Sequence, residues 1–385
     1  MKRIRWGMVG GGRDAFIGAV HRMAARLDDQ FELVAGALSS DPVRAQESGR
    51  DLGLSPERNY GSYQEMAAAE TARSDGIEAV SIVTPNNTHA PIAKAFLERG
   101  VHVICDKPLA VSTREAAELV ELTKQVKRIL AVTYNYTGYP MVRQAREMCR
   151  TGAVGNVRLV HVEYLQDWLA SRVELLGSKQ AEWRTDPARA GAGGAIGDIG
   201  THAYHLMRFI TGLEVTELCA ELTSFAAGRR LDDDARILLR LGSSARGVLW
   251  ASQVATGNEN ELSIRVYGDK GGLEWRQSDA NRLVHTSLDK SREIMTRGSR
   301  AVSQAAARVT RIPAGHPEGY LEAFGALYAE IARGIRATQL GQLPADDVWY
   351  PDARDGLDGV RFIEAAVRSS AAQGTWIPLQ GRAIA

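Results

Sequence analysis

The stretch MVGGGRDAFIGAVHR, residues 8–22, places three consecutive glycines between a short apolar run and a helix-like segment. Glycines at such a turn let the backbone approach a pyrophosphate at the N-terminus of the following helix. In the usual dinucleotide fingerprint the third glycine would stand where this chain has Ala15, and the next glycine is Gly18. Either Ala15 replaces that glycine or the turn is three residues longer. Both alternatives keep Gly10 and Gly12 as cofactor-binding residues.

Outward from this turn, apolar runs alternate with helix-like segments through the first third of the chain. The expected strands are Ile4–Val9, Phe31–Leu38, Ile77–Val83, Val101–Cys105 and Ile129–Tyr134, and the expected helices are Ala15–Leu27, Asp41–Leu52, Ala90–Arg99 and Thr113–Lys127. This alternation predicts a parallel sheet with helices on both faces. We therefore expect an α/β dinucleotide-binding Rossmann domain over residues 1–135.

The rest of the chain has a different pattern, with strand-like runs that follow one another closely. They are Val157–Gln166, Val215–Phe225, Ala235–Leu241, Arg246–Val254, Leu262–Tyr267, Gly271–Arg276 and Arg282–Ser287. Such a run predicts an α+β domain with a large, open, mostly antiparallel sheet, here over residues 136–385, for substrate binding and oligomerisation.

Helices must cover one face of this second sheet. The candidates are 203–210, 319–336 and 356–372, and residues 291–311 are interpreted as a helical insert or lid. A partner subunit would cover the remaining sheet surface, so we expect a homodimer or homotetramer.

Composition limits the kinds of partner. The 385 residues include 47 basic and 46 acidic side chains, and this balance gives no global field for nucleic acid or an anionic membrane. The N-terminal segment lacks the features of a signal peptide, and no stretch approaches the length of a membrane span. The three cysteines, Cys105, Cys149 and Cys219, are far apart and suggest neither zinc nor a redox pair. We expect a cytoplasmic protein with a small-molecule substrate and no metal.

The end of the second strand bears on the choice of cofactor. An acidic residue commonly stands there to bind the ribose diol of NAD, but the sequence is ALSSDPVRA, with Ser39 at that place. Ser40 and Arg44 follow, and Arg44 could pair with the 2′-phosphate of NADP. Asp41 could serve the diol or cap the next helix. The cofactor is therefore NAD or NADP, and we favour NAD.

Three further segments carry a family resemblance: TPNNTH (residues 84–89), CDKPLA (105–110) and GGAIGDIGTH (193–202). In order and spacing they resemble the Gfo/Idh/MocA family of glucose-fructose oxidoreductase, inositol dehydrogenases and related sugar dehydrogenases. The E-K-P motif of that family is D-K-P here. The resemblance implies NAD(P)-dependent oxidation of CH–OH groups.

The resemblance also implies roles for single residues. Lys107 would hold the cofactor and polarise the substrate, Asp198 would orient the substrate or the base, and His202 would be the general base. The expected cofactor-binding residues of the motif turns are Thr84, Pro85, Asn87, His89, Asp106 and Lys107. The segment HPEGYLEAF resembles one that related dehydrogenases carry before a late helix, which places His316 and Glu318 near the substrate.

The residue types suit this chemistry. Oxidising a secondary alcohol requires a base for the hydroxyl proton and a positive charge near the oxygen, and Lys107 supplies an ammonium at the carboxyl end of a parallel strand. Asp198 and His202 are four residues apart, so on a helix they share one face. A metal bound by Asp198, His202 and His205 is a minor alternative. We expect His205 to face the core.

The substrate is expected to be a cyclic polyol: a hexose derivative, a glycoside or an inositol. Tyr136, Trp168 and Arg184 are candidate substrate-binding residues because polyols need hydrogen-bonding groups and flat apolar faces. Two other functions remain open. One is a glycosidase that oxidises its sugar transiently and returns the hydride; the other is a sensor that binds a dinucleotide without catalysis.

Overall fold

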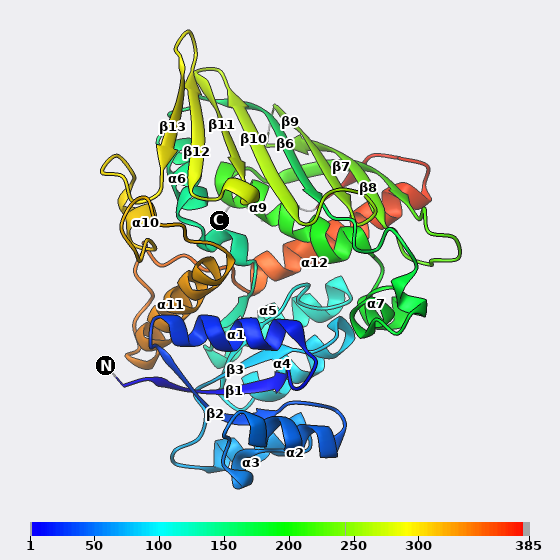
Figure 1. Ribbon diagram of the computed structural model, residues 1–385, viewed down its shortest axis with the longest axis vertical. Coiled ribbons are helices and arrows are strands. Elements are labelled where there is room, and N and C mark those ends of the chain that lie inside the picture. Colours follow the sequence, from blue (N-terminus) through cyan, green and yellow to red (C-terminus); the bar gives the residue numbers. More distant parts are fainter. Residues whose placement is uncertain (1, 243, 380–385) are drawn as a thin grey trace. The chain divides into compact units, whose positions relative to one another are not determined.

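The computed structural model describes residues 2–242 and 244–379 of the chain, which form two compact units (Figure 1). Unit 1 contains the chain up to Asn135 and Tyr320–Leu357. Unit 2 contains Tyr136–Gly319 and the chain from Asp358 onward.

Unit 1 is built on a five-stranded sheet in the order β2-β1-β3-β4-β5, with every neighbouring pair parallel. The strands are β1 (Ile4–Gly10), β2 (Phe31–Ala37), β3 (Ala79–Val83), β4 (His102–Cys105) and β5 (Leu130–Val132). The helices are α1 (Phe16–Leu27), α2 (Pro42–Asp51), α3 (Tyr63–Ala72), α4 (His89–Leu97), α5 (Thr113–Val126) and α11 (Tyr320–Gln339). The predicted Rossmann-type parallel sheet is confirmed.

Helix α11 packs against α1 in unit 1 (Figure 1). The expectation that this segment covers the second sheet was wrong. Its apolar side chains, Phe324, Leu327, Tyr328 and Ile331 among them, belong to the same buried core as Trp6 of β1 and Phe31 of β2. Burial of this apolar surface offsets the entropic cost of bringing α11 back to the first domain.

A buried chain of hydrogen bonds ties α11 to the sheet. The Tyr328 hydroxyl lies 2.7 Å from His21 Nδ1 and 2.7 Å from Ser81 Oγ, which also accepts from Trp6 Nε1 at 2.9 Å. His21 is fully buried, and this burial lowers its pKa to about 4. The native protein therefore holds His21 neutral at physiological pH.

Unit 2 is built on a nine-stranded sheet in the order β13-β12-β11-β10-β6-β9-β8-β7-β14, in which only β6 and β9 pair in parallel (Figure 1). The strands are β6 (Val157–Leu165), β7 (Val215–Thr223), β8 (Asp234–Leu241), β9 (Ala245–Ser252), β10 (Glu261–Gly268), β11 (Gly271–Arg276), β12 (Arg282–Ser287), β13 (Arg292–Thr296) and β14 (Ile377–Pro378). The predicted large, mostly antiparallel sheet is confirmed.

Helices α6 (Pro140–Arg150) and α9 (Thr201–Thr211) pack against this sheet and against each other. The short helices α7 (Lys179–Arg184), α8 (Pro187–Ala190) and α10 (Gln304–Ala307) lie in the connections, and α12 (Ala353–Ala371) begins in unit 1 and continues into unit 2. Residues 291–311 were interpreted as a helical insert, but β13 pairs with β12 over Arg292–Thr296, and only α10 is helical. The antiparallel register from Arg282 opposite Thr296 to Thr286 opposite Arg292 joins these segments as a hairpin.

The other face of this sheet carries exposed apolar side chains. Leu238 of β8, Val248 of β9 and His161 of β6 are direct cross-strand neighbours, and Leu238 and Val248 are 50% and 39% exposed.

Within residues 2–242 and 244–379, no helix has the length and apolar character that crossing a membrane requires.

The neutral state of His21 predicts a pH dependence of stability. The unfolded chain binds this proton near pH 6.5 and the native chain only near pH 4, so the stabilisation is complete above pH 6.5 and is lost as the pH falls toward 4. Each such group contributes a slope of about 1.4 kcal/mol per pH unit to the free energy of unfolding. We expect His21→Gln to reduce the slope measured by urea unfolding between pH 6.5 and 4.5. The exposed His316→Gln is the control, and an unchanged slope in His21→Gln would contradict the assignment.

Candidate functional site

The glycine turn resolves the alternative that the sequence left open. Helix α1 begins at Phe16 with Ala15 as its N-cap, and Gly18 lies in its first turn. A Cβ atom on Gly18 would lie 2.4 Å from the Cα atom of Gly11, so only glycine allows this approach of helix and strand. Gly18 therefore fills the role of the third fingerprint glycine, and the turn is three residues longer than usual.

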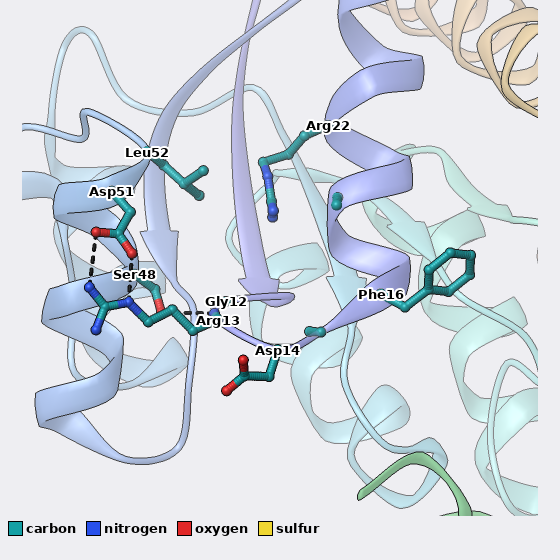
Figure 2. A pocket seen from close by; sticks show the side chains of 10 residues that line it. Gly12, Arg13, Asp14, Phe16, Arg22, Ser48, Asp51 and Leu52 are labelled. Atoms are coloured by element: carbon teal, nitrogen blue, oxygen red, sulfur yellow. Dashed lines mark hydrogen bonds and ion pairs between the residues drawn. The ribbon is translucent and has the colours of Figure 1, made fainter. Parts of the chain in front are cut away.

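Helix α2 fixes the extra residues of the turn. Arg13 donates from its backbone N–H to Ser48 Oγ at 3.1 Å and from Nε to Asp51 Oδ2 at 2.6 Å (Figure 2). Arg22 of α1 donates to the carbonyl oxygen of Gly11 at 2.7 Å. A cavity of about 500 Å³ lies beside this turn, between α1 and α2, and is lined by Phe16, Arg22 and Leu52 among others.

The segment that follows β2 presents the hydroxyls of Ser39 and Ser40 where a carboxylate is common. Ser39 Oγ accepts from Asp41 N at 3.1 Å, and Asp41 Oδ1 accepts from Arg44 N at 2.7 Å as the N-cap of α2. Asp41 thus performs the capping role considered above. Ser40 and the Arg44 side chain are exposed.

The turn after β3 contains the TPNNTH motif. Thr84 and Pro85 are partly buried, and Asn87 is exposed in a short 3₁₀ turn (Asn86–Thr88). His89 is 1% exposed, with Nε2 2.8 Å from the Thr84 carbonyl oxygen and Nδ1 2.8 Å from that of Pro108. Burial lowers its pKa. His89 therefore connects the turn after β3 to the turn after β4.

The turn after β4 carries Asp106 and Lys107. Asp106 Oδ1 accepts from the backbone N–H of Lys107 at 3.0 Å and from Thr133 Oγ1 at 2.7 Å, which orients this carboxylate within its own turn. Lys107 is partly exposed. Because β1, β3 and β4 are adjacent and parallel, the glycine turn, Thr84 and Lys107 all lie at the carboxyl edge of one sheet, where ligands of such sheets bind. The close glycine approach and this edge fit a dinucleotide.

In unit 2, Asp198 and His202 lie on one continuous helical segment. A π-helical turn, Ile196–Gly200, runs directly into α9. Asp198 Oδ2 accepts from Gln253 Nε2 at 2.9 Å and from Arg184 Nε at 3.2 Å. The structure thus brings the predicted substrate residue Arg184 to Asp198, and it adds Gln253, which no motif indicated.

Aromatic rings surround His202, which is 8% exposed. The Tyr136 ring meets the His202 ring edge to face at 5.0 Å between centroids. The Tyr136 hydroxyl lies 2.5 Å from that of Tyr164, which donates to Asn260 Oδ1 at 2.8 Å. Tyr136 is only 3% exposed, so it forms the wall beside His202.

The remaining predicted substrate residues have different environments. The guanidinium of Arg184 lies 4.2 Å from the Trp183 ring centroid and 6.0 Å from that of Trp168, whose Nε1 donates to Gln166 Oε1 at 3.0 Å. His316 is exposed. Glu318 is buried, and its carboxylate accepts hydrogen bonds from Arg297 at 2.9 Å and from the backbone N–H groups of residues 311 and 312. These contacts give Glu318 a structural role.

His205 is 5% exposed and stacks with Phe209 of the same helix, as expected for a core-facing residue. Across the described residues, no group of three or more His, Cys, Asp or Glu side chains is arranged to hold a metal ion.

Comparison with known proteins identifies the family. Residues 4–134 match the model of an oxidoreductase family with an NAD-binding Rossmann fold, and residues 142–274 match that of the GFO/IDH/MocA C-terminal domain. The chain belongs to the Gfo/Idh/MocA family of oxidoreductases, as the motifs indicated, and its first domain is an NAD-binding Rossmann domain.

Similar proteins span the whole chain. A solved oxidoreductase from Sinorhizobium meliloti is 52% identical, with a TM-score of 0.89 over 98% of this chain and 100% of that one. An inositol dehydrogenase homologue from Azotobacter vinelandii, solved with NADH and myo-inositol, is 37% identical, with a TM-score of 0.92 over 98% of each chain. The levoglucosan dehydrogenase of Pseudarthrobacter phenanthrenivorans is 28% identical over 98% of both chains.

The contact between Gly18 and Gly11 predicts a selective loss of cofactor binding. In Gly18→Ala the added methyl group pushes α1 away from Gly11 in the glycine turn, and we expect a loss of about 2 kcal/mol in stability. NADH binding should weaken by about tenfold or more, because the turn moves with the helix. Fluorescence titration with NADH and thermal unfolding measure both effects. Ala15→Gly is the matched control, and the Gly18 assignment fails if this control weakens NADH binding more than Gly18→Ala does.

Proposed function

We propose that this oxidoreductase is an NAD-dependent dehydrogenase that oxidises a secondary ring hydroxyl of a cyclic polyol, namely an inositol, a sugar or a glycoside. The observation that carries the proposal is the ordered set of motifs around Lys107, Asp198 and His202 within this family. Relatives across the full chain support the substrate class, because the Azotobacter vinelandii homologue was solved with myo-inositol and another relative is a levoglucosan dehydrogenase.

In this proposal the chain's own residues handle the hydroxyl. Lys107 donates to the substrate oxygen and stabilises the negative charge that develops on it. His202 takes the hydroxyl proton, and Asp198, held by Gln253 and Arg184, orients the substrate or the base. NAD⁺ held at the carboxyl edge of the parallel sheet would supply the acceptor for the hydride that leaves the same carbon. The alcohol thus loses a proton and a hydride and becomes a ketone or a lactone.

The cofactor and substrate contacts follow from the same assignment. Gly10, Gly12, Thr84, Pro85, Asn87 and Asp106 form the edge that receives the dinucleotide, with Ser39, Ser40 and Arg44 beside its adenosine ribose and His89 supporting two of these turns. Tyr136 and Trp168 supply flat faces for a ring. Arg184 acts on the substrate chiefly through Asp198, with which it forms a hydrogen bond. His316 contacts the substrate from an exposed segment.

The test is a panel of inositols, monosaccharides and glycosides, each assayed with NAD⁺ and with NADP⁺ for absorbance of the reduced nicotinamide. We expect NAD⁺ reduction with at least one polyol. In Lys107→Ala, turnover should fall by about 100-fold or more while NADH still binds, because the lysine charge acts mainly on the reacting oxygen.

Two outcomes would overturn the proposal. Release of a sugar from a glycoside without net reduction of the nicotinamide would indicate the glycosidase. NADH binding without turnover of any polyol would favour the sensor. Full activity of Lys107→Ala would contradict the role of that lysine.

We also propose that the exposed sheet face of unit 2 binds a second copy of this chain. Leu159, Leu238 and Val248 form its apolar centre, and the same face carries Arg240 and Arg246 on two strands and Glu163 on a third. A two-fold axis through such a face lets each copy offer apolar surface and opposite charges to the other. Unit 2 would then combine substrate binding with assembly.

Leu238→Asp tests this interface by placing a charge in the centre of the apolar row. We expect light scattering coupled to gel filtration to show a homodimer or homotetramer for the unmodified chain and a smaller species for Leu238→Asp. Leu343→Asp makes the same change at a leucine that is 91% exposed in unit 1, and it should leave the assembly intact. An unmodified chain that is monomeric would overturn the proposal.

A further inference from the structure

A carboxylate outside every motif discussed so far holds the backbone of the turn that carries Asp198 and His202. Asp232 lies in the connection between β7 and β8, two residues before β8 begins at Asp234. Its Oδ1 accepts from the backbone N–H of Gly194 at 2.6 Å, and its Oδ2 accepts from that of Ile196 at 2.8 Å. Its carbonyl oxygen accepts from Ala195 N at 2.8 Å. One residue thus binds three consecutive N–H groups of the turn.

These three N–H groups stand where the helical segment begins. The first N–H groups of a helix have no partner within it and need a cap. Ala195 precedes the π-helical turn and offers no capping side chain, so the cap comes from Asp232, 36 residues further along the chain. A carboxylate that accepts such bonds forms stronger hydrogen bonds than a neutral acceptor and also complements the helix dipole.

The approach of the two backbones is close enough to exclude a side chain on the turn. A Cβ atom on Gly194 would lie 2.0 Å from the carbonyl oxygen of Asp232 and 3.0 Å from Leu231 Cβ. The glycine of the motif is therefore explained by the neighbouring β7–β8 connection rather than by the ligand. The same contact means that a displacement of Asp232 displaces the turn.

The adjacent residue extends this support to Asp198 itself. The carbonyl oxygen of Asp233 accepts from Gln253 N at 2.8 Å, and the Gln253 side chain donates to Asp198 Oδ2 at 2.9 Å. Asp198 is thus held through the backbone of its own turn by Asp232 and through its side chain by Gln253. His202 follows one helical turn later and is carried by the same rigid segment.

We propose that Asp232 is the positioning residue of this catalytic turn, and that its two carboxylate oxygens set the direction in which Asp198 and His202 are presented to the substrate. The inference rests on the proposed function for the roles of those two residues. Burial raises the pKa of Asp232 to about 6, so the carboxylate is ionised at the alkaline pH of a dehydrogenase assay. The charge is held at an energetic cost, which a purely apolar packing role would not require.

Asp232→Asn tests the proposal because it keeps the shape and replaces one acceptor oxygen by an NH₂ group. That group would face a backbone N–H, so one of the two bonds is lost. We expect kcat for the polyol to fall by about 10- to 100-fold, as for a misplacement of catalytic groups on the ångström scale. NADH affinity should stay within about twofold, because the Rossmann domain is unchanged.

Asp234→Asn is the matched control. Asp234, two residues later, also uses its carboxylate as a partly buried acceptor, but its partners are Trp250 Nε1 at 2.9 Å and Arg236 at 3.3 Å, neither of which belongs to the turn. Its kcat should remain within about threefold of the unmodified enzyme. Equal losses in the two variants would reduce Asp232 to a general structural role and overturn the proposal, as would an Asp232→Asn enzyme with unchanged kcat.

A second measurement does not depend on turnover. In protein labelled with ¹³C-histidine, the eight histidines give separate ring signals, and a His202 variant assigns that of His202. We expect Asp232→Asn to move the His202 signal and to leave that of His285, on β12, in place. An unmoved His202 signal overturns the proposal. If the unmodified enzyme oxidises no polyol, the proposed function fails while this measurement still decides the role of Asp232.

If Asp232→Asn does not yield folded protein, Asp232→Ser gives the same decision, because its hydroxyl keeps one acceptor oxygen at lower volume. NADH titration and thermal unfolding establish that each variant is folded before kinetics or spectra are compared.

Discussion

The approach of Gly18 to Gly11 is the constraint on which the cofactor end of the molecule depends. With Gly18 Cα in that position, the start of α1 lies directly against the glycine turn that follows β1, and its N-terminus is presented at the carboxyl edge of the parallel sheet. The longer turn is fixed in position because Arg13 joins it to α2 by hydrogen bonds to Ser48 and Asp51. A turn held from both helices can receive a dinucleotide without first becoming ordered, which lowers the entropic cost of binding.

In unit 2 the start of a helix is also held by another segment of the chain, but through a different kind of contact. The helix that carries Asp198 and His202 begins in a glycine-rich turn that has no capping side chain of its own, and a carboxylate from the β7–β8 connection supplies the cap. In both units, therefore, a motif glycine marks close contact between two backbones. The partners of Asp198 are Gln253, which directly follows β9, and Arg184, which ends α7, so two other segments converge on one carboxylate.

The sequence predicted the two sheets because the strands of each sheet have their own pattern of apolar and polar residues. Buried parallel strands such as AVSIV appear as continuous apolar runs, and half-exposed antiparallel strands such as DARILLRL alternate. The same reasoning failed for Arg292–Thr296, whose exposed edge position leaves no buried side to produce a clear apolar stripe. It also assigned α11 to the wrong sheet, because amphipathicity shows that a helix has an apolar face but not which surface covers it.

The sequence by itself determined the family, the NAD-binding Rossmann domain, the mostly antiparallel second sheet and the segments that carry the candidate site, since these depend on local periodicity and on short motifs. Tertiary structure alone decided that Gly18 rather than Ala15 is the third glycine, that α11 belongs to the first unit, and that Gln253 and Asp232 support Asp198 and its turn. These last facts rest on contacts between residues far apart in the chain, and no local pattern encodes which distant backbone a carboxylate will meet.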